Sequence, residues 1–149
     1  MPRQLSHNQI KNDGTITLTQ KHYIEKEILE IYKPTKQYKT PAINNESDDS
    51  GDHKLIDKNY YLQKLMKLYY IAARTRPDIL LTAVSYAAAT NEPTTIHDNK
   101  LNRIIGYLDA TKDMQMHISE TDLTLFAQFD ASFATHDDMK SHSGKLIDI

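Results

Sequence analysis

An acidic run without a single apolar side chain limits how this chain of 149 residues can fold. Residues 44–52 read Asn-Asn-Glu-Ser-Asp-Asp-Ser-Gly-Asp. Such a stretch cannot bury enough apolar surface to offset the conformational entropy that is lost when a chain becomes ordered. We therefore predict a flexible acidic linker over residues 39–57. This linker separates an N-terminal unit, residues 1–38, from a helical region that follows.

The N-terminal unit is expected to be a strand followed by a helix. Residues 15–19, Thr-Ile-Thr-Leu-Thr, alternate polar and apolar side chains, which is typical of a half-buried strand. From Gln20 the apolar residues recur at helical spacing. Thr19 is placed to cap this helix, and Pro34 follows its expected end. The first twelve residues show no periodicity, so no element is assigned to them.

Three helices are predicted for residues 58–112. The first is capped by Asp57 or Asn59, and proline within 75–78 ends it and starts the next, because proline is tolerated only in a helix's first turn. The second helix, from about 77 to 90, is small and apolar on all sides and must therefore be covered on most of them. The third helix is expected from about 95 to 109.

Residues 113–149 are expected to form strands, because polar and apolar side chains alternate there. The alternation covers 114–118 and 123–129, and residues 145–149 begin a further strand. We expect an incomplete antiparallel sheet, truncated within its last strand at residues 145–149. The unpaired edge of that strand would be prone to association. The predicted fold class is α+β: a strand–helix unit, an acidic linker, a three-helix portion and this incomplete sheet.

Composition excludes several classes of function. The chain has no cysteine, which removes disulfides, zinc knuckles, thiolate catalysis and iron–sulfur clusters. A net charge of −2 argues against a dedicated polybasic nucleic-acid binder. The N-terminus lacks the apolar core of a secretory signal, and the longest apolar stretch, 79–89, is too short to span a bilayer. We expect an intracellular protein, cytoplasmic or nuclear, that does not bind membranes.

Three blocks of sequence carry a resemblance to a known family. They are residues 14–26, residues 61–111 with Arg76-Pro77-Asp78-Ile79 and Tyr107-Leu108 followed by Thr111, and residues 129–144 beginning Phe129-Asp130-Ala131-Ser132. In order and spacing the blocks resemble the polyprotein of copia-type long-terminal-repeat retrotransposons. The resemblance implies the C-terminal end of a reverse transcriptase, including its thumb and connection region, running into the first strands of a ribonuclease H domain.

The departures from this family pattern decide what chemistry the resemblance implies. The polymerase motif, tyrosine-x-aspartate-aspartate, is absent, and the later acidic residues of ribonuclease H are missing. Asp109-Ala110 stands where the family usually has lysine-glycine, and 64–67 lacks a common glycine. We therefore expect a polyprotein fragment that is inactive alone. Its parent would carry out RNA-directed DNA polymerisation and would cleave RNA–DNA hybrids with Mg²⁺.

Asp130 is the candidate catalytic and metal-binding residue. It matches the family's first metal-binding aspartate, although the alternative is an aspartate that simply ends a strand. One carboxylate holds Mg²⁺ poorly without partners, so no cofactor is expected for this chain itself. Asp137 and Asp138 are interpreted as a solvated loop pair. A zinc site formed by His136 and His142 is considered and disfavoured, because it lacks a third fixed ligand.

Six cations of the helical region form the candidate nucleic-acid-binding set. They are Lys64, Lys67, Arg74, Arg76, Lys100 and Arg103. The resemblance implies that this region supports a template–primer duplex or an RNA–DNA hybrid, beside the rest of the polyprotein. The alternative is that Arg76 pairs with Asp78 to fix the corner between helices while the lysines form a solvated face. Tyr60, Tyr61, Tyr69 and Tyr70 can stack on bases, but at helical spacing they are more often core residues.

Two other functions compete with that of an inactive fragment. The first is a co-opted module that binds nucleic acid or a protein partner through the three helices. The second is a nuclease that is completed by carboxylates from a partner chain.

Overall fold

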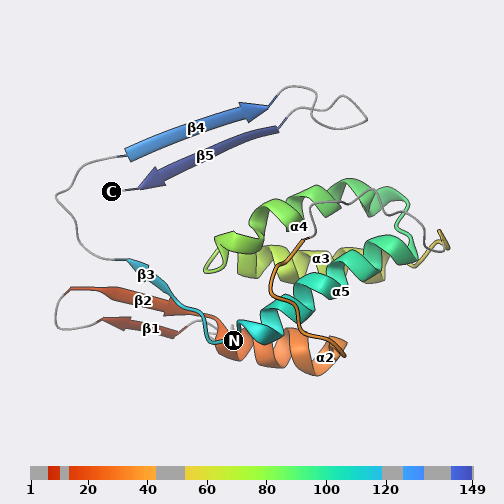
Figure 1. Cartoon of the computed structure of the whole chain (residues 1–149), viewed down its shortest axis with the longest axis horizontal. Coiled ribbons are helices and arrows are strands. Elements are labelled where there is room, and N and C mark those ends of the chain that lie inside the picture. Colours follow the sequence, from red (N-terminus) through yellow and green to blue (C-terminus); the bar gives the residue numbers. More distant parts are fainter. Residues whose placement is uncertain (1–6, 11–13, 43–52, 119–125, 133–141, 149) are drawn as a thin grey trace.

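A three-stranded antiparallel sheet lies at one end of the helices in the computed structural model (Figure 1). The structure describes residues 7–10, 14–42, 53–118, 126–132 and 142–148, so the acidic run at 44–52 lies outside the described residues. The strands are β1 (His7–Ile10), β2 (Ile16–Thr19) and β3 (Met116–Ile118), in the order β1-β2-β3. Gly14, between β1 and β2, has a φ of 82°, a conformation that glycine adopts without strain.

Two of these strands differ from the sequence prediction. The segment containing β1 has no alternation of apolar residues, so the sequence predicts no element there, yet it pairs with β2. The residues of β3 were grouped with the C-terminal strands, but β3 pairs with β2, and Thr17 Oγ1 lies 3.1 Å from His117 Nδ1. The pairing of β2 with β3, about 100 residues apart, is set by tertiary contacts, which local periodicity does not report.

A helical segment follows β2 where the periodicity predicted it. It consists of α1 (Lys21–Tyr23), a π-helical part η1 (Ile24–Leu29) and α2 (Glu30–Tyr32). The prediction that Thr19 is the N-cap is wrong by one residue, because Gln20 occupies that position; the Thr19 hydroxyl accepts a hydrogen bond from the Lys21 backbone N–H at 3.2 Å. The segment ends at Lys33, whose left-handed φ of 44° turns the chain into Pro34.

The three predicted helices are present after the linker. They are α3 (Lys58–Ala72), α4 (Leu80–Ala87) and α5 (Thr95–Ala110), and short 3₁₀ turns η2 (Pro77–Ile79) and η3 (Ala88–Asn91) flank α4. Asp57 caps α3 by accepting from the Tyr60 backbone N–H at 2.7 Å. Thr94 and His97 form a capping box at the start of α5. Pro77 occupies the first turn of η2, as its chemistry requires.

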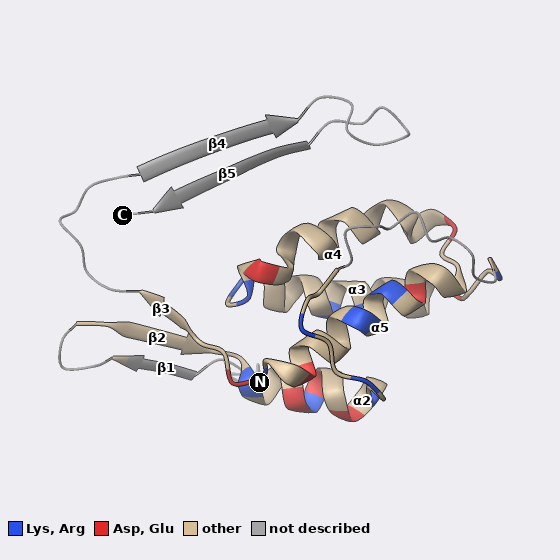
Figure 2. Ribbon diagram, viewed as in Figure 1, with Lys and Arg blue, Asp and Glu red and all other residues tan. Residues whose placement is uncertain are grey.

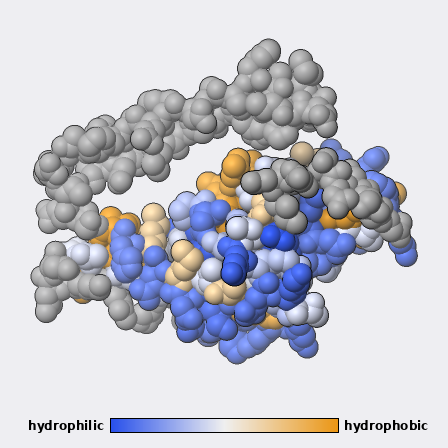
Figure 3. Space-filling view, in the orientation of Figure 1, coloured by the Kyte–Doolittle hydropathy of each residue, from blue (hydrophilic) through white to orange (hydrophobic). Residues whose placement is uncertain are grey.

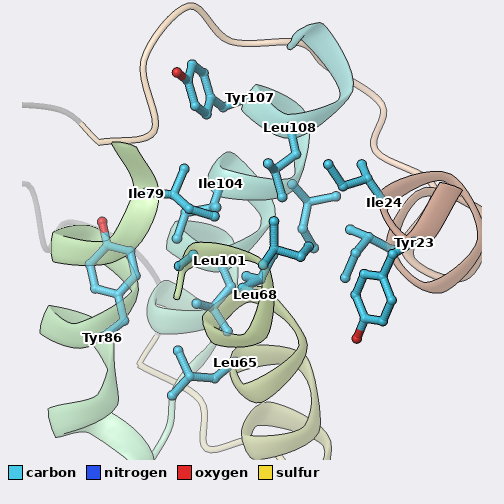
Figure 4. Close-up of a cluster of buried hydrophobic side chains, with 14 of the residues drawn as sticks. Tyr23, Ile24, Leu65, Leu68, Ile79, Tyr86, Leu101, Ile104, Tyr107 and Leu108 are labelled. Carbon is cyan, nitrogen blue, oxygen red and sulfur yellow. The ribbon is translucent and has the colours of Figure 1, made fainter. Parts of the chain in front are cut away.

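One hydrophobic core joins the N-terminal unit to the three helices (Figure 4). Ile24 and Ile28 of η1 are fully buried together with Leu68 of α3 and Leu101 and Ile104 of α5. The regions before and after the acidic run therefore pack as a single body. The apolar stripe of the N-terminal helix needs a partner, and the faces of α3 and α5 provide it.

Part of the predicted linker is hydrogen-bonded to the start of α5. Leu55 forms an isolated bridge with Thr94, and the Ile56 backbone N–H donates to the Pro93 carbonyl at 3.0 Å. The Thr95 backbone N–H donates to the Lys54 carbonyl at 2.9 Å. These bonds use the unpaired backbone groups that precede a helix, so the described end of the linker is anchored.

A second sheet consists of β4 (Phe126–Ser132) and β5 (His142–Asp148), which pair antiparallel from Phe126 with Asp148 to Ser132 with His142. Strands were predicted at 123–129 and 145–149, so both overlap the observed ones. Within the described part of the chain, each of the two strands has one hydrogen-bonded neighbour. The fold is mixed helix and strand. Among the residues that the structure describes, none of the helices has the length and apolar character needed to cross a membrane.

Candidate nucleic-acid interface

Arg76 lies at a buried corner between helices and does not face solvent. Its side chain is 2% exposed and donates to both carboxylate oxygens of Asp78, with Nη2 2.7 Å from Oδ2. The same guanidinium donates to the Thr111 carbonyl at 3.1 Å and to its hydroxyl at 2.7 Å. Of the two roles considered for Arg76, the local pairing with Asp78 is therefore confirmed, and its guanidinium is not available to a phosphate.

Tyr107 completes this corner network. Its hydroxyl donates to Asp78 Oδ2 at 2.8 Å, and its ring lies 5.4 Å from the Arg76 guanidinium. Burial opposes ionisation of Asp78, but the hydrogen bonds from Arg76 and Tyr107 outweigh it, so the pKa of Asp78 lies below its usual value. The Arg-Pro-Asp motif and the Tyr-Leu…Thr motif, about 30 residues apart within one block, thus meet in one cluster.

Lys64 is also interior, which differs from its expected place in the surface set. Its side chain is 1% exposed, and the ammonium donates to Asp98 Oδ1 at 2.7 Å and to Asn102 Oδ1 at 2.6 Å. The rings of Tyr32 and Tyr60 lie 5.1 and 5.4 Å from it. The sequence held a signal of this burial, because helical spacing puts Lys64 on the same side of α3 as the buried apolar residues.

The other two cations near α3 remain accessible in part. Lys67 is half-buried and donates to Glu27 Oε2 at 3.1 Å. Arg74 is exposed just after α3, with its guanidinium 5.3 Å from the Tyr70 ring. The ion pair with Glu27 weakens the attraction of Lys67 for a phosphate, so Arg74 is the more available of the two cations.

A basic face is formed by α5 and the loop that crosses it. Arg103 stacks 4.3 Å from the Tyr38 ring and donates to Thr40 Oγ1 at 3.0 Å, while the Lys36 ammonium lies 5.2 Å from the same ring. Lys100, also on α5, lies 6.0 Å from the Tyr86 ring. We call Lys33, Lys36, Lys100 and Arg103 the basic face. Blue segments of α5 and of this loop lie beside each other in Figure 2.

Sequence reasoning missed the loop's contribution to this face. Residues 32–39, Tyr-Lys-Pro-Thr-Lys-Gln-Tyr-Lys, were assigned to a helix end and a linker, although lysines interleaved with tyrosines are a known signal of nucleic-acid binding. The nearby carboxylates have partners. Asp98 binds Lys64, and Asp109 accepts from Gln37 at 2.7 Å and lies 3.6 Å from Lys112. The lysines and Arg103 therefore dominate the local charge.

The candidate metal site stays a prediction. Asp130 lies in β4 opposite Gly144, and its side chain is outside those described. His142 pairs with Ser132, while the positions of His136, Asp137 and Asp138 lie outside the described residues. Within the described residues, no group of three potential metal-ligating side chains occurs.

The four tyrosines considered for base stacking divide into two kinds. Tyr61 is fully buried and donates to the Tyr86 carbonyl at 2.9 Å, and burial raises the pKa of Tyr61 to about 12. Tyr70 packs against Tyr23 with ring centroids 5.0 Å apart. Tyr60 and Tyr69 are exposed. The core interpretation therefore fits Tyr61, whereas Tyr60 and Tyr69 can contact a ligand.

Comparison of the chain with protein-family models, curated proteins and solved structures gives no significant match.

Proposed function

We propose that this chain is a segment of the reverse transcriptase and ribonuclease H region of a copia-type polyprotein, and that alone it binds nucleic acid without catalysis. The corner network supports the family assignment. Arg76 and Asp78 come from one motif of the second block of the resemblance, Tyr107 and Thr111 from another motif of the same block, and all four are joined by hydrogen bonds. A pair of motifs that forms one structural unit is more specific than two isolated matches.

The observation that carries the binding proposal is the basic face. Its cations come from two segments, and tyrosine rings lie beside Lys36, Lys100 and Arg103, while Asp98 and Asp109 accept hydrogen bonds from Lys64 and Gln37. Lysine and arginine side chains in such a cluster neutralise phosphates and release counterions. The expected partners are an RNA–DNA hybrid or a template–primer duplex, together with the rest of the polyprotein. In the intact parent, Asp130 would contribute one ligand to Mg²⁺.

A salt titration tests this proposal. Fluorescence anisotropy of a labelled RNA–DNA hybrid is measured with the full chain between low and moderate salt. We expect log K to fall with log salt, and the double variant Lys36→Gln/Lys100→Gln to reduce that slope by roughly 1.4 to 1.8, since each phosphate contact contributes about 0.7 to 0.9. Arg74→Gln tests a second, smaller cationic site, which consists of Lys67 and Arg74 beside α3.

The matched control is Lys58→Gln. Lys58 is exposed and hydrogen-bonded to Asn91, and it belongs to neither cationic site. Its replacement should leave the slope within error of the original chain. Binding that is absent, or that does not depend on salt, would contradict the proposal, as would equal slopes for the control and the double variant.

A further inference from the structure

A cleft of about 330 Å³ opens beside the basic face, between the turn after α2 and the first half of α5. The residues that line it are Tyr32, Lys33, Pro34, Thr35, Lys36, Tyr38, Asn99 and Asn102. Its volume lies at the lower end of the range for small-molecule sites, roughly 300 to 1,000 Å³. The cleft therefore suits one nucleotide-sized ligand. The surface around α5 and the loop is largely hydrophilic in Figure 3.

The loop wall of the cleft is fixed against α5 by close packing. A Cβ atom at Gly106 would lie 2.2 Å from the Lys36 carbonyl oxygen and 2.8 Å from Tyr38 Cδ2, so only glycine permits this approach. The Tyr38 backbone N–H lies 3.4 Å from the Gly106 carbonyl oxygen, and Arg103 stacks on the Tyr38 ring. These contacts hold Lys36 and Tyr38 in position before any ligand binds.

The helical wall is held by the buried Lys64 network. Lys64 donates to Asn102 Oδ1 at 2.6 Å, and Asn102 Nδ2 donates to Asp98 Oδ2 at 3.3 Å, which fixes the orientation of this amide. The same ammonium lies 5.1 Å from the ring of Tyr32, another lining residue. A cation that is almost wholly buried thus organises two of the side chains that line the cleft.

The side chains of the cleft combine three kinds of recognition. Tyr32 and Tyr38 contribute aromatic rings to the lining, Lys33 and Lys36 offer charge for a phosphate, and the exposed Asn99 offers both donors and an acceptor for a base edge. None of the lining residues is acidic, so the cleft favours an anion. We propose that it binds one unpaired nucleotide, a base with its phosphate. This inference rests on the proposed nucleic-acid binding and locates it more closely.

The test compares two labelled RNA–DNA hybrids of equal duplex length, one blunt and one with a single-nucleotide overhang. Anisotropy titrations with the full chain should show roughly tenfold tighter binding of the overhang, the order expected for one stacked base. Asn99→Ala should reduce this preference by about two- to tenfold, the loss expected for one hydrogen bond, and leave the affinity for the blunt hybrid unchanged. Lys100→Gln, outside the lining, should weaken both hybrids alike and keep the preference.

Lys33→Gly removes a lining cation without endangering the fold, because glycine suits the left-handed φ of 44° at this position. It should lower the preference for the overhang while the chain remains folded by circular dichroism. Adenosine monophosphate is then added as a competitor. If it removes the overhang's advantage, the cleft takes free nucleotides as well. If the advantage persists, the cleft takes only a nucleotide carried by a strand.

The failures of the two proposals are distinguishable. Equal affinities for the blunt and overhang hybrids, or a preference that Asn99→Ala leaves intact, would overturn the cleft assignment while nucleic-acid binding stands. Absence of binding to both hybrids would overturn the proposed function and the cleft assignment together.

Discussion

The corner at Arg76 and the basic face on α5 use the same kinds of side chain for opposite purposes. At the corner, one arginine is buried, and two residues accept its hydrogen bonds. On the basic face, Arg103 and Lys36 lie against Tyr38 with part of their charge open to solvent. A buried cation that is hydrogen-bonded to neighbouring residues stabilises one geometry, whereas an exposed cation such as Lys36 can exchange water for a ligand. Position relative to the core separates structural cations from candidate binding ones.

The largest expected effect is at the corner. Arg76→Ala removes the partner of Asp78 and five hydrogen bonds, and it should lower the free energy of unfolding by about 3 kcal/mol, the lower end for breaking a buried pair, because Asp78 is partly exposed. Urea denaturation measures it. Arg74→Ala, two residues earlier and exposed, should change stability by less than about 0.5 kcal/mol. Similar losses in both variants would erase the contrast between the two regions.

Gly106→Ala tests whether the loop wall of the cleft is rigid. The new Cβ would meet the Lys36 carbonyl at 2.2 Å, and we expect a net loss of about 1 to 2 kcal/mol in the free energy of unfolding, after the gain in helix propensity. Thermal or urea unfolding shows directly whether Gly106→Ala raises or lowers the stability. A gain of stability would mean that the loop moves away easily, and the preorganised cleft would then be an incorrect description.

The free energy of unfolding at acidic pH should show the contribution of the Asp78–Arg76 pair. The pKa of Asp78 is below its usual value, so its contribution is complete above the usual carboxyl range and is lost as the pH falls through the lowered folded value. Unfolding measured from pH 6 downward should show this loss. Asp78→Asn should be less stable at pH 6 and should lose less as the pH falls. Parallel profiles for the two chains would be inconsistent with a strongly paired Asp78.

The smallest effect on stability should be at Lys33. A lysine with a φ of 44° is in a region that non-glycine residues rarely occupy, so Lys33→Gly should raise the free energy of unfolding by up to about 1 kcal/mol. The same variant should bind the overhang hybrid less well. Lys33→Asn, which tolerates the left-handed region, controls for backbone relief. Loss of stability in Lys33→Gly would show that the lysine side chain itself holds the turn.

Local chemistry made much of the fold predictable. The helical spacing of apolar residues located α3, α4 and α5, Asp57 was identified as a possible cap, and Pro77 marked the restart at η2. The possible pairing of Arg76 with Asp78 was also visible, because the two residues are neighbours on one turn. Each of these features is decided within a few residues of chain.

Other features required the folded chain. The alternation in β2 says nothing of its two partners, one of which is β3, about 100 residues away. The lysine-rich loop after α2 gave no sign that it would cross α5 at Gly106. The interior position of Lys64 needed Asp98 and Asn102 to be presented by a different helix. The candidate binding set therefore changed more than the list of helices did.

The sequence by itself determined which segments are helical and which of their residues are apolar, because backbone hydrogen bonds and side-chain spacing act over one or two turns. Only the tertiary structure decided which cations are buried, which strands pair and where a cleft opens. Those outcomes depend on contacts between residues such as Lys36 and Gly106 or Arg76 and Thr111, and such contacts form only when the hydrophobic core brings distant segments together.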